Sequence, residues 1–158
     1  EAVTRLHGLG IAHGDVSAEN AVLRVEGAEV EVALLDFGLA IHGTDLAAVR
    51  GGRGKRMYQA PETVGQDSVF DARAADLFAC GVVGYILAIG NYPWETTAGT
   101  CKAFSYVQKH GLARFFEKRT VLVGSSKVPV SQILSPGFRA VLLSLLDLDP
   151  QKRRDPWA

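Results

Sequence analysis

An uncharged stretch in the middle of the chain is the strongest constraint on its fold. The 18 residues from Leu77 to Trp94 contain no Asp, Glu, Lys or Arg, but they include three glycines, Asn91 and Pro93. A membrane span needs roughly 20 predominantly apolar residues, so this segment is marginal for that role. A helix buried in a protein core fits better. Asp71 is a suitable N-cap for this helix, which is expected to end near Gly90.

The composition is that of a globular protein without a charge bias. Of 158 residues, 47% are hydrophobic and 8% aromatic, and the 17 Lys and Arg balance 17 Asp and Glu. This balance gives no general electrostatic attraction to nucleic acid or to membranes. Cys80 and Cys101 are too few for a disulfide framework or a zinc site, and the four histidines lack metal-ligand spacing. Two ordinary thiols predict an intracellular, cytoplasmic protein.

A β-hairpin is predicted in the first quarter of the chain. Residues 21–25 and 30–35 are rich in Val and Leu, and residues 26–29 form the turn between them. Asn20 precedes the first strand and Asp36 follows the second, so antiparallel pairing brings these two residues to one edge. Amide and carboxylate oxygens suit a hard cation, and the hairpin therefore predicts a Mg²⁺ site.

Three further helices are predicted from apolar periodicity. One covers the start of the chain, where Ala2, Leu6 and Leu9 would share a buried face, and another covers residues 100–109. The third begins at Ser135-Pro136, because a capping residue precedes a proline at the first helical position, and it ends at Asp149-Pro150. Its core face comprises Phe138, Val141, Leu142, Leu145 and Leu146.

Two segments are predicted to be irregular. Residues 41–57 lose periodicity and gain several glycines, which predicts a long loop, and residues 124–131 read as a polar connector. The expected fold class is mainly α with a small β-hairpin.

The loop before the hairpin carries the chemistry. Residues 13–20 read HGDVSAEN, and Asp15 lies on the segment that leads to the edge shared by Asn20 and Asp36. A candidate base beside two metal ligands is the equipment for metal-assisted transfer of a phosphoryl group to a hydroxyl. A single Asp in a turn is more often a cap, so this interpretation depends on the whole constellation.

Three motifs in this order resemble the catalytic core of the eukaryotic protein kinases. They are HGD at 13–15 with Asn20 after four intervening residues, DFG at 36–38, and APE at 60–62. The resemblance covers residues 1–158 as the large, C-terminal lobe of a kinase domain, with a catalytic loop at 13–20 and an activation segment at 36–62.

The resemblance implies a role for each of these positions. Asp15 would orient or accept the proton of the substrate hydroxyl, and Asn20 and Asp36 would hold Mg²⁺ on the phosphates of ATP. Glu19 is typical of kinases that act on Ser and Thr of proteins. The supporting positions are His13 and Phe37 in a hydrophobic spine, Val22 under the adenine, Asp76 on the catalytic-loop backbone, and the pair of Glu62 with Arg153 of the DPQKR segment.

Gly14 departs from the family, whose members usually carry arginine there. That arginine neutralises a phosphate on the activation segment. Between Ile41 and Met57 the only hydroxyl side chain is Thr44. We therefore expect a kinase of the non-RD type that does not require activation-segment phosphorylation.

Ser17 and Lys55 form a second, reciprocal departure. Ser17 stands where Ser/Thr kinases usually carry lysine, and Lys55 stands where they carry the threonine of a Gly-Thr pair. Electrostatic stabilisation of the transfer requires a cation, and we predict that Lys55 supplies it. The alternative is that Lys55 belongs to a solvated basic loop.

The small lobe of the family has no counterpart in these residues. There is no glycine-rich phosphate loop and no VAIK-type lysine. We therefore expect the chain to be part of a longer protein, and to bind ATP poorly and be almost inactive by itself.

Two other functions remain open. A pseudokinase or scaffold would use the lobe for binding alone. The basic segment 50–56 resembles an RGG box, which would bind RNA through phosphate contacts. The expected partners are ATP and a protein substrate, rather than nucleic acid or a membrane.

Overall fold

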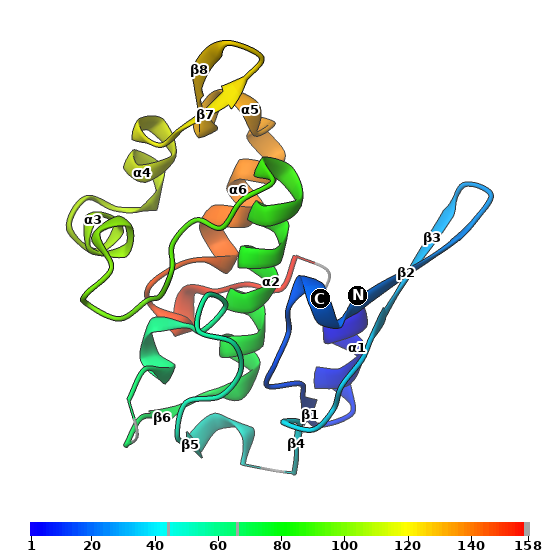
Figure 1. Ribbon diagram of the computed structural model, residues 1–158. Coiled ribbons are helices and arrows are strands. Elements are labelled where there is room, and N and C mark those ends of the chain that lie inside the picture. The colour runs from blue at the N-terminus through cyan, green and yellow to red at the C-terminus, as the bar shows by residue number, and fades with distance from the viewer. Residues whose placement is uncertain (44, 66, 157–158) are drawn as a thin grey trace.

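The chain folds into a mostly helical body with short sheets. The computed structural model describes residues 1–43, 45–65 and 67–156. Its α-helices are α1 (Ala2–Gly8), α2 (Ala72–Ile89), α3 (Lys102–His110), α4 (Leu112–Lys118), α5 (Val130–Ile133) and α6 (Pro136–Leu145). Figure 1 shows α2 at the centre of the body, with α6 behind it.

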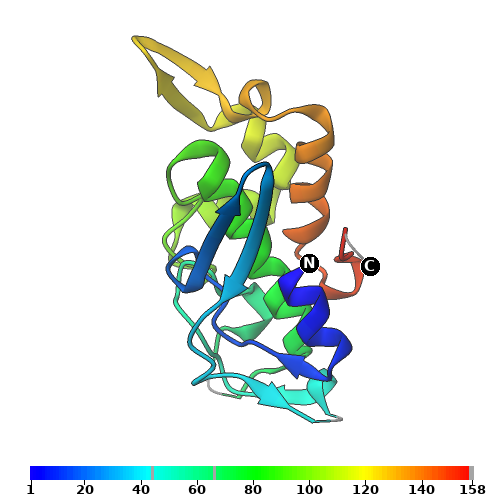
Figure 2. The same cartoon turned by 90° about the vertical axis from the view of Figure 1, so that its right-hand side faces the viewer.

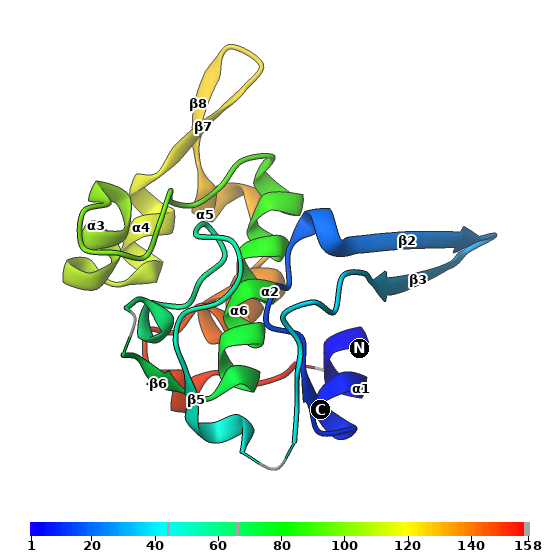
Figure 3. The same ribbon diagram turned by 60° about the horizontal axis from the view of Figure 1, so that its bottom comes forward.

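The strands form four antiparallel pairs within the described residues. These are β1 (Ile11–Ala12) with β4 (Ile41–His42), β2 (Ala21–Glu26) with β3 (Glu29–Leu34), β5 (Val49–Arg50) with β6 (Val69–Phe70), and β7 (Thr120–Val123) with β8 (Ser126–Pro129). The fold class is confirmed, but one small hairpin was an underestimate. Helix α1 lies beside the last described residues (Figures 1 and 3), where Thr4 donates a hydrogen bond of 2.7 Å to Asp155.

Helix α2, which contains most of the uncharged stretch, begins and ends where the sequence predicts. Asp71 accepts a hydrogen bond from the backbone N–H of Arg73, and Gly90 closes the helix at φ 75°. Its mean hydropathy of 1.6 and its length would suffice for a membrane span. Phe78 and Val82 are nevertheless fully buried in the main hydrophobic core. Packing within the protein accounts for the apolar sequence.

Helix α6 crosses α2 at two glycines. A Cβ atom on Gly81 would lie 2.7 Å from the side chain of Leu146 and 3.0 Å from Cβ of Leu145. On Gly84 it would lie 3.2 Å from Leu142 and 3.3 Å from the ring of Phe138, which is 37% exposed. The Gly81 contact is therefore locked in the core. At Gly84 the ring of Phe138 can move outward, and the buried Leu142 side chain needs to shift by only a few tenths of an ångström.

This contrast predicts opposite effects of two matched substitutions. Gly81→Ala should lower the free energy of unfolding by about 1–3 kcal/mol through overpacking, despite its gain in helix propensity. Gly84→Ala should be neutral or stabilise by up to about 1 kcal/mol, because the propensity gain prevails. Urea denaturation followed by circular dichroism measures both. Equal effects at the two positions would contradict this packing.

The β2–β3 hairpin has the predicted register. Ala21 pairs with Leu34, and the turn contains Gly27 at φ 61°. The backbone N–H of Leu35 donates to the carbonyl of Asn20 at 2.8 Å, which extends the pairing to the edge. The hairpin projects from the body in Figure 1, and in Figure 2 it lies in front of the body and points towards the viewer. Asn20 and the residue before Asp36 therefore meet at its base.

Residues 124–131 are not a polar connector, and that prediction is wrong. Strands β7 and β8 form a second projecting hairpin, closed by Gly124 at φ 61°, and α5 follows directly. Leu122 is 70% exposed and Val123 is 54% exposed. Backbone pairing holds these strands, rather than burial of one apolar face, so their sequence lacks a clear alternating pattern.

Residues 41–57 are also more ordered than a long loop. They contain β4, β5 and a 3₁₀ turn at Leu46–Ala48 that buries Leu46. Each of these two-residue strands pairs with a distant segment, β1 or β6. Local periodicity carries no information about such pairing.

Two helix boundaries differ from expectation. Helix α1 ends at Gly8 and buries Val3, so Leu9 lies beyond the helix and is 69% exposed. Helix α6 ends at Leu145 rather than at Asp149-Pro150, because the chain turns where the side chain of Asp147 accepts from the backbone N–H of Asp149.

Candidate active site

Hydrogen bonds to Asp76 of the central helix α2 hold the candidate catalytic loop in place. One carboxylate oxygen of Asp76 accepts from the backbone N–H of His13 at 2.7 Å, and the other accepts from that of Gly14 at 2.9 Å. His7 Nε2 lies 3.0 Å from the same carboxylate. Asp76 is only 3% exposed. These hydrogen bonds satisfy a buried acid and hold the loop backbone in one place.

His13 joins this loop to the DFG segment. Its buried ring lies 4.9 Å from the ring of Phe37, and its Nε2 lies 3.0 Å from the carbonyl oxygen of Leu35. Asp36, between these two residues, adopts a left-handed φ of 60°, and its carboxylate accepts from the backbone N–H of Gly38. Such backbone conformations in non-glycine residues cluster at functional sites.

Asn20 lies against Asp15. Its side-chain N–H₂ donates to the carbonyl oxygen and to the carboxylate of Asp15, both at 2.9 Å. This arrangement commits the amide nitrogen and leaves the amide oxygen as the acceptor for a further ligand. Asp36 follows strand β3 and adds a carboxylate at the same end of the hairpin as Asn20. Two oxygen donors fit Mg²⁺, which completes its shell with water and substrate phosphates.

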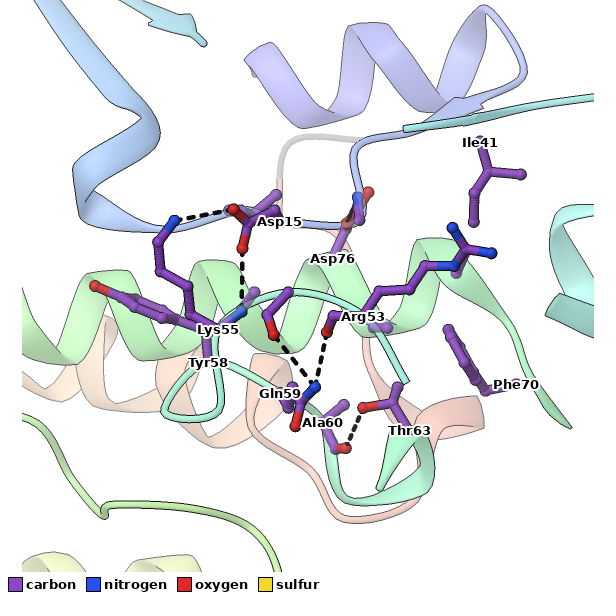
Figure 4. A pocket seen from close by; sticks show the side chains of 16 residues that line it. Asp15, Ile41, Arg53, Lys55, Tyr58, Gln59, Ala60, Thr63, Phe70 and Asp76 are labelled. Atoms are coloured by element: carbon purple, nitrogen blue, oxygen red, sulfur yellow. Dashed lines mark hydrogen bonds and ion pairs between the residues drawn. The ribbon is translucent and has the colours of Figure 1, made fainter. Parts of the chain in front are cut away.

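Lys55 reaches Asp15 and Ser17 together. Its ammonium lies 2.9 Å from the Asp15 carboxylate and 2.9 Å from the Ser17 hydroxyl. Its backbone N–H also donates to Asp15 at 3.1 Å. Ser17 is fully buried, and Figure 4 shows Lys55 extending towards Asp15. The structure therefore brings the two reciprocal departures into direct contact, rather than leaving Lys55 in solvent.

Two tyrosines that sequence reasoning did not assign to the site surround Glu19. The hydroxyl of Tyr58 lies 2.9 Å from the Glu19 carboxylate, and Tyr92 donates to the same carboxylate at 3.3 Å. Burial acts to raise the pKa of Glu19, but hydrogen bonds from the backbone, Tyr58, Ser17 and Tyr92 outweigh it and lower the pKa. Burial, with these partners, raises the pKa of Tyr58. The only sequence signal for Tyr58 was its place just before the APE motif.

Gly14 has a conformational requirement of its own. Its φ is +76°, and a Cβ atom there would lie 2.5 Å from the carbonyl oxygen of Leu39. An arginine would therefore need both a left-handed backbone and a displaced Leu39. Thr44, the only hydroxyl side chain between Ile41 and Met57 in the sequence, lies outside the described residues.

Restoring arginine should consequently harm this loop. Gly14→Arg and Gly14→Ala should each lower the free energy of unfolding by at least about 1–2 kcal/mol, the cost of left-handed backbone in an L-residue. Gly10→Ala is a matched control, because Gly10 has φ +71° but its Cβ would meet nothing closer than 3.8 Å. Thermal denaturation should give Gly14→Ala a lower Tm than Gly10→Ala. The reverse order would show that the backbone at Leu39 can move away from a Cβ atom on residue 14 at little cost.

The end of the activation segment is tied to the end of the chain. Arg153 forms a two-pronged ion pair with Glu62, which lies in the 3₁₀ turn Pro61–Thr63. One of its two hydrogen bonds is 2.8 Å long. The Arg153 side chain is completely buried, so this is an internal ion pair.

Val22, the residue predicted to lie under the adenine, is on β2 and is 44% exposed.

The basic segment 50–56 does not present all its charges to solvent. Lys55 and Arg53 leave it in opposite directions, and Arg53 lines a cavity of about 30 Å³ with Ile41 (Figure 4). Arg50 and Arg56 are exposed. The segment therefore exposes two of its cations, while the ammonium of Lys55 is held by Asp15 and Ser17.

Comparison with known proteins places the chain in a broad family. The sequence matches the family model described as "Protein kinase domain" over residues 1–156. It is 29% identical over 154 residues to calcium/calmodulin-dependent protein kinase type II of Caenorhabditis elegans, covering 97% of this chain and 19% of that protein. It is 31% identical to CBL-interacting protein kinase 16 of Oryza sativa subsp. japonica, covering 99% and 32%.

A third relative is Serine/threonine-protein kinase ULK3 of Xenopus laevis. The identity is 32% over 153 residues, covering 96% of this chain and 29% of the relative. The chain thus spans a third or less of the length of these relatives.

Proposed function

The chain belongs to the protein kinase family, and on that premise we propose that it carries the phosphoryl-transfer site of a protein serine/threonine kinase. The observation that carries this proposal is the Asp15 carboxylate, held between the amide of Asn20 and the ammonium of Lys55. The proposed donor is ATP, and the proposed acceptors are protein hydroxyls.

Asp15 is the proposed base. Its two hydrogen-bonded neighbours fix the direction of the carboxylate, so that it can orient a substrate hydroxyl and accept its proton. Asn20 and Asp36 would hold Mg²⁺ on the ATP phosphates, and the bound ion would supply charge neutralisation there. Val22 is proposed to lie under the adenine, and His13 and Phe37 keep the two loops aligned.

Lys55 is the proposed cation of the transfer. We propose that it serves beside Asp15 in place of the family's catalytic-loop lysine, and its ammonium donates a hydrogen bond to the Ser17 hydroxyl. A fixed positive charge stabilises the negative charge of the transition state at no reorganisation cost. Glu19 and the names of relatives such as Serine/threonine-protein kinase ULK3 support Ser and Thr as acceptors.

A pseudokinase or scaffold is the second candidate. Gly14 and Ser17 favour it, because both depart from the family pattern. The three groups that phosphoryl transfer needs, Asp15, Asn20 and Asp36, are nevertheless all present, and Asn20 contacts Asp15 directly. Because these 158 residues contain no glycine-rich loop or VAIK lysine, we propose that they bind nucleotide weakly by themselves.

Phosphorylation of a serine peptide by the longest expressible form of the protein tests the proposal. We expect Mg²⁺-dependent transfer from ATP that Asp36→Asn lowers by at least about a hundred-fold, because the metal ligand is lost. Asp67→Asn is the matched control, since Asp67 is exposed and has no ion-pair partner among the described residues. Bound ATP without any transfer would instead establish the scaffold function.

A further inference from the structure

A large hollow lies beside the end of the activation segment. It has a volume of about 810 Å³ and is bordered by Met57, by the turn from Tyr92 to Glu95, by the start of α3 and by the end of α4. We call it the α3–α4 groove. Its size is in the range of ligand sites, and no residue of the proposed phosphoryl-transfer site lines it.

The rim of the α3–α4 groove is positively charged. Lys102, Lys118 and Arg119 line it together with a single acid, Glu95. All three cations are exposed, and none has an ion-pair partner among the described residues. The chain as a whole carries no net charge. This groove is therefore a local positive feature that attracts an anionic ligand.

The floor of the groove contains an unsatisfied donor. Trp94 is 3% exposed and lines the groove, and its indole N–H has no hydrogen-bond partner among the described residues. An indole N–H only donates, so it requires an acceptor oxygen. Buried donors in native proteins are nearly always paired, and a water molecule can satisfy this one as well as a ligand oxygen can, so the indole does not by itself select a ligand.

Two lining residues connect the groove to the segments that carry the phosphoryl-transfer site. Tyr92, on its border, donates to Glu19 of the catalytic loop, and Met57 follows Lys55 by two residues. The groove therefore borders the activation segment at Met57, and through Tyr92 it borders a residue that contacts the catalytic loop.

We propose that the α3–α4 groove docks an acidic segment that flanks the acceptor Ser or Thr of the protein substrate. The inference rests on the proposed function, because it takes the hydroxyl at Asp15 as its starting point. Carboxylates would pair with the three cations, and a main-chain or side-chain oxygen would accept from Trp94. We take a protein segment as the occupant because it supplies both the carboxylates and the acceptor hydroxyl, and binding of RNA is an outcome of the test below.

Calorimetric titration of the 158-residue chain tests docking without requiring activity. The probe is a 12-residue peptide with one Ser followed by four Glu, and its control carries Gln in place of each Glu. We expect the Glu peptide to bind more tightly, and Lys118→Gln/Arg119→Gln to weaken it about ten-fold. Lys109→Gln/Lys127→Gln removes two exposed cations outside the groove and should leave binding unchanged. Lys102→Gln is a second groove variant, on a different helix.

The outcomes separate this inference from the proposed function. Equal binding of the Glu and Gln peptides, or equal effects of the groove and control variants, would overturn docking. A 12-nucleotide oligouridylate that binds more tightly than the Glu peptide would also overturn it. If the Glu peptide binds as expected but the longest form of the protein phosphorylates no peptide, docking stands and the kinase proposal fails. If Glu and Gln peptides are phosphorylated with the same KM, the kinase proposal stands and docking fails.

Discussion

Arg153→Ala should lower the free energy of unfolding by about 3–5 kcal/mol, the cost of leaving a buried ion without its partner. The completely buried guanidinium makes a two-pronged pair with Glu62 and also donates to the carbonyl oxygens of Ala74 and Asp147. It lies 4.9 Å from the centre of the Phe78 ring as well. Removal leaves the Glu62 carboxylate, only 17% exposed, without its counter-ion.

The expected loss is measured by urea denaturation of the chain followed by circular dichroism. Arg154→Ala is the neighbouring control, because Arg154 is exposed and bonds only to nearby backbone carbonyls, and it should change stability by less than about 0.5 kcal/mol. Arg153→Lys should fall between the two, since lysine keeps the charge but cannot pair through two prongs. A cost below about 1 kcal/mol for Arg153→Ala would mean that the activation segment is held by other contacts.

Lys55→Met should lower the rate of phosphoryl transfer by about 10²–10³-fold, the usual effect of removing one preorganised electrostatic group. The methionine retains much of the side-chain volume but removes the ammonium from Asp15 and Ser17. The loss should appear in kcat, with little change in the KM for ATP, if the charge acts in the transition state. Initial rates of peptide phosphorylation measure both quantities.

Arg56→Met is the matched control for this substitution. Arg56 adjoins Lys55 but is exposed, with no ion pair among the described residues. It should retain nearly full kcat. If Lys55→Met and Arg56→Met had equal, small effects, Lys55 would be one charge of a solvated basic loop.

The sequence was most informative where local chemistry determines the structure. The cap at Asp71, the glycine stop at Gly90 and the hairpin register from Ala21 to Leu34 follow from short-range signals. The reciprocal exchange of Ser17 and Lys55 also pointed to a contact that the structure contains.

Long-range pairing was not accessible in this way. The two-residue strands β1 and β4 pair across about thirty residues, and β7–β8 is held by its turn rather than by a buried face. Tyr58 and Tyr92 come from separate segments to contact Glu19, and nothing in their local sequence pairs them. The positive φ of Gly14 became evident only when Leu39 was placed against it.

A double-mutant cycle over Ser17 and Lys55 tests the central claim most directly. The measurement uses the longest expressible form of the protein. It is the single-turnover rate of transfer from Mg-ATP to a serine peptide, for the wild type, Ser17→Lys, Lys55→Thr and the double variant. We predict transfer by the wild type, slow transfer by Lys55→Thr, and recovery in the double variant, because lysine then returns to the loop beside Asp15. Strong coupling between contacting residues is the expected signature. A wild type that binds Mg-ATP without transferring phosphate, or two single effects that simply add, would contradict it.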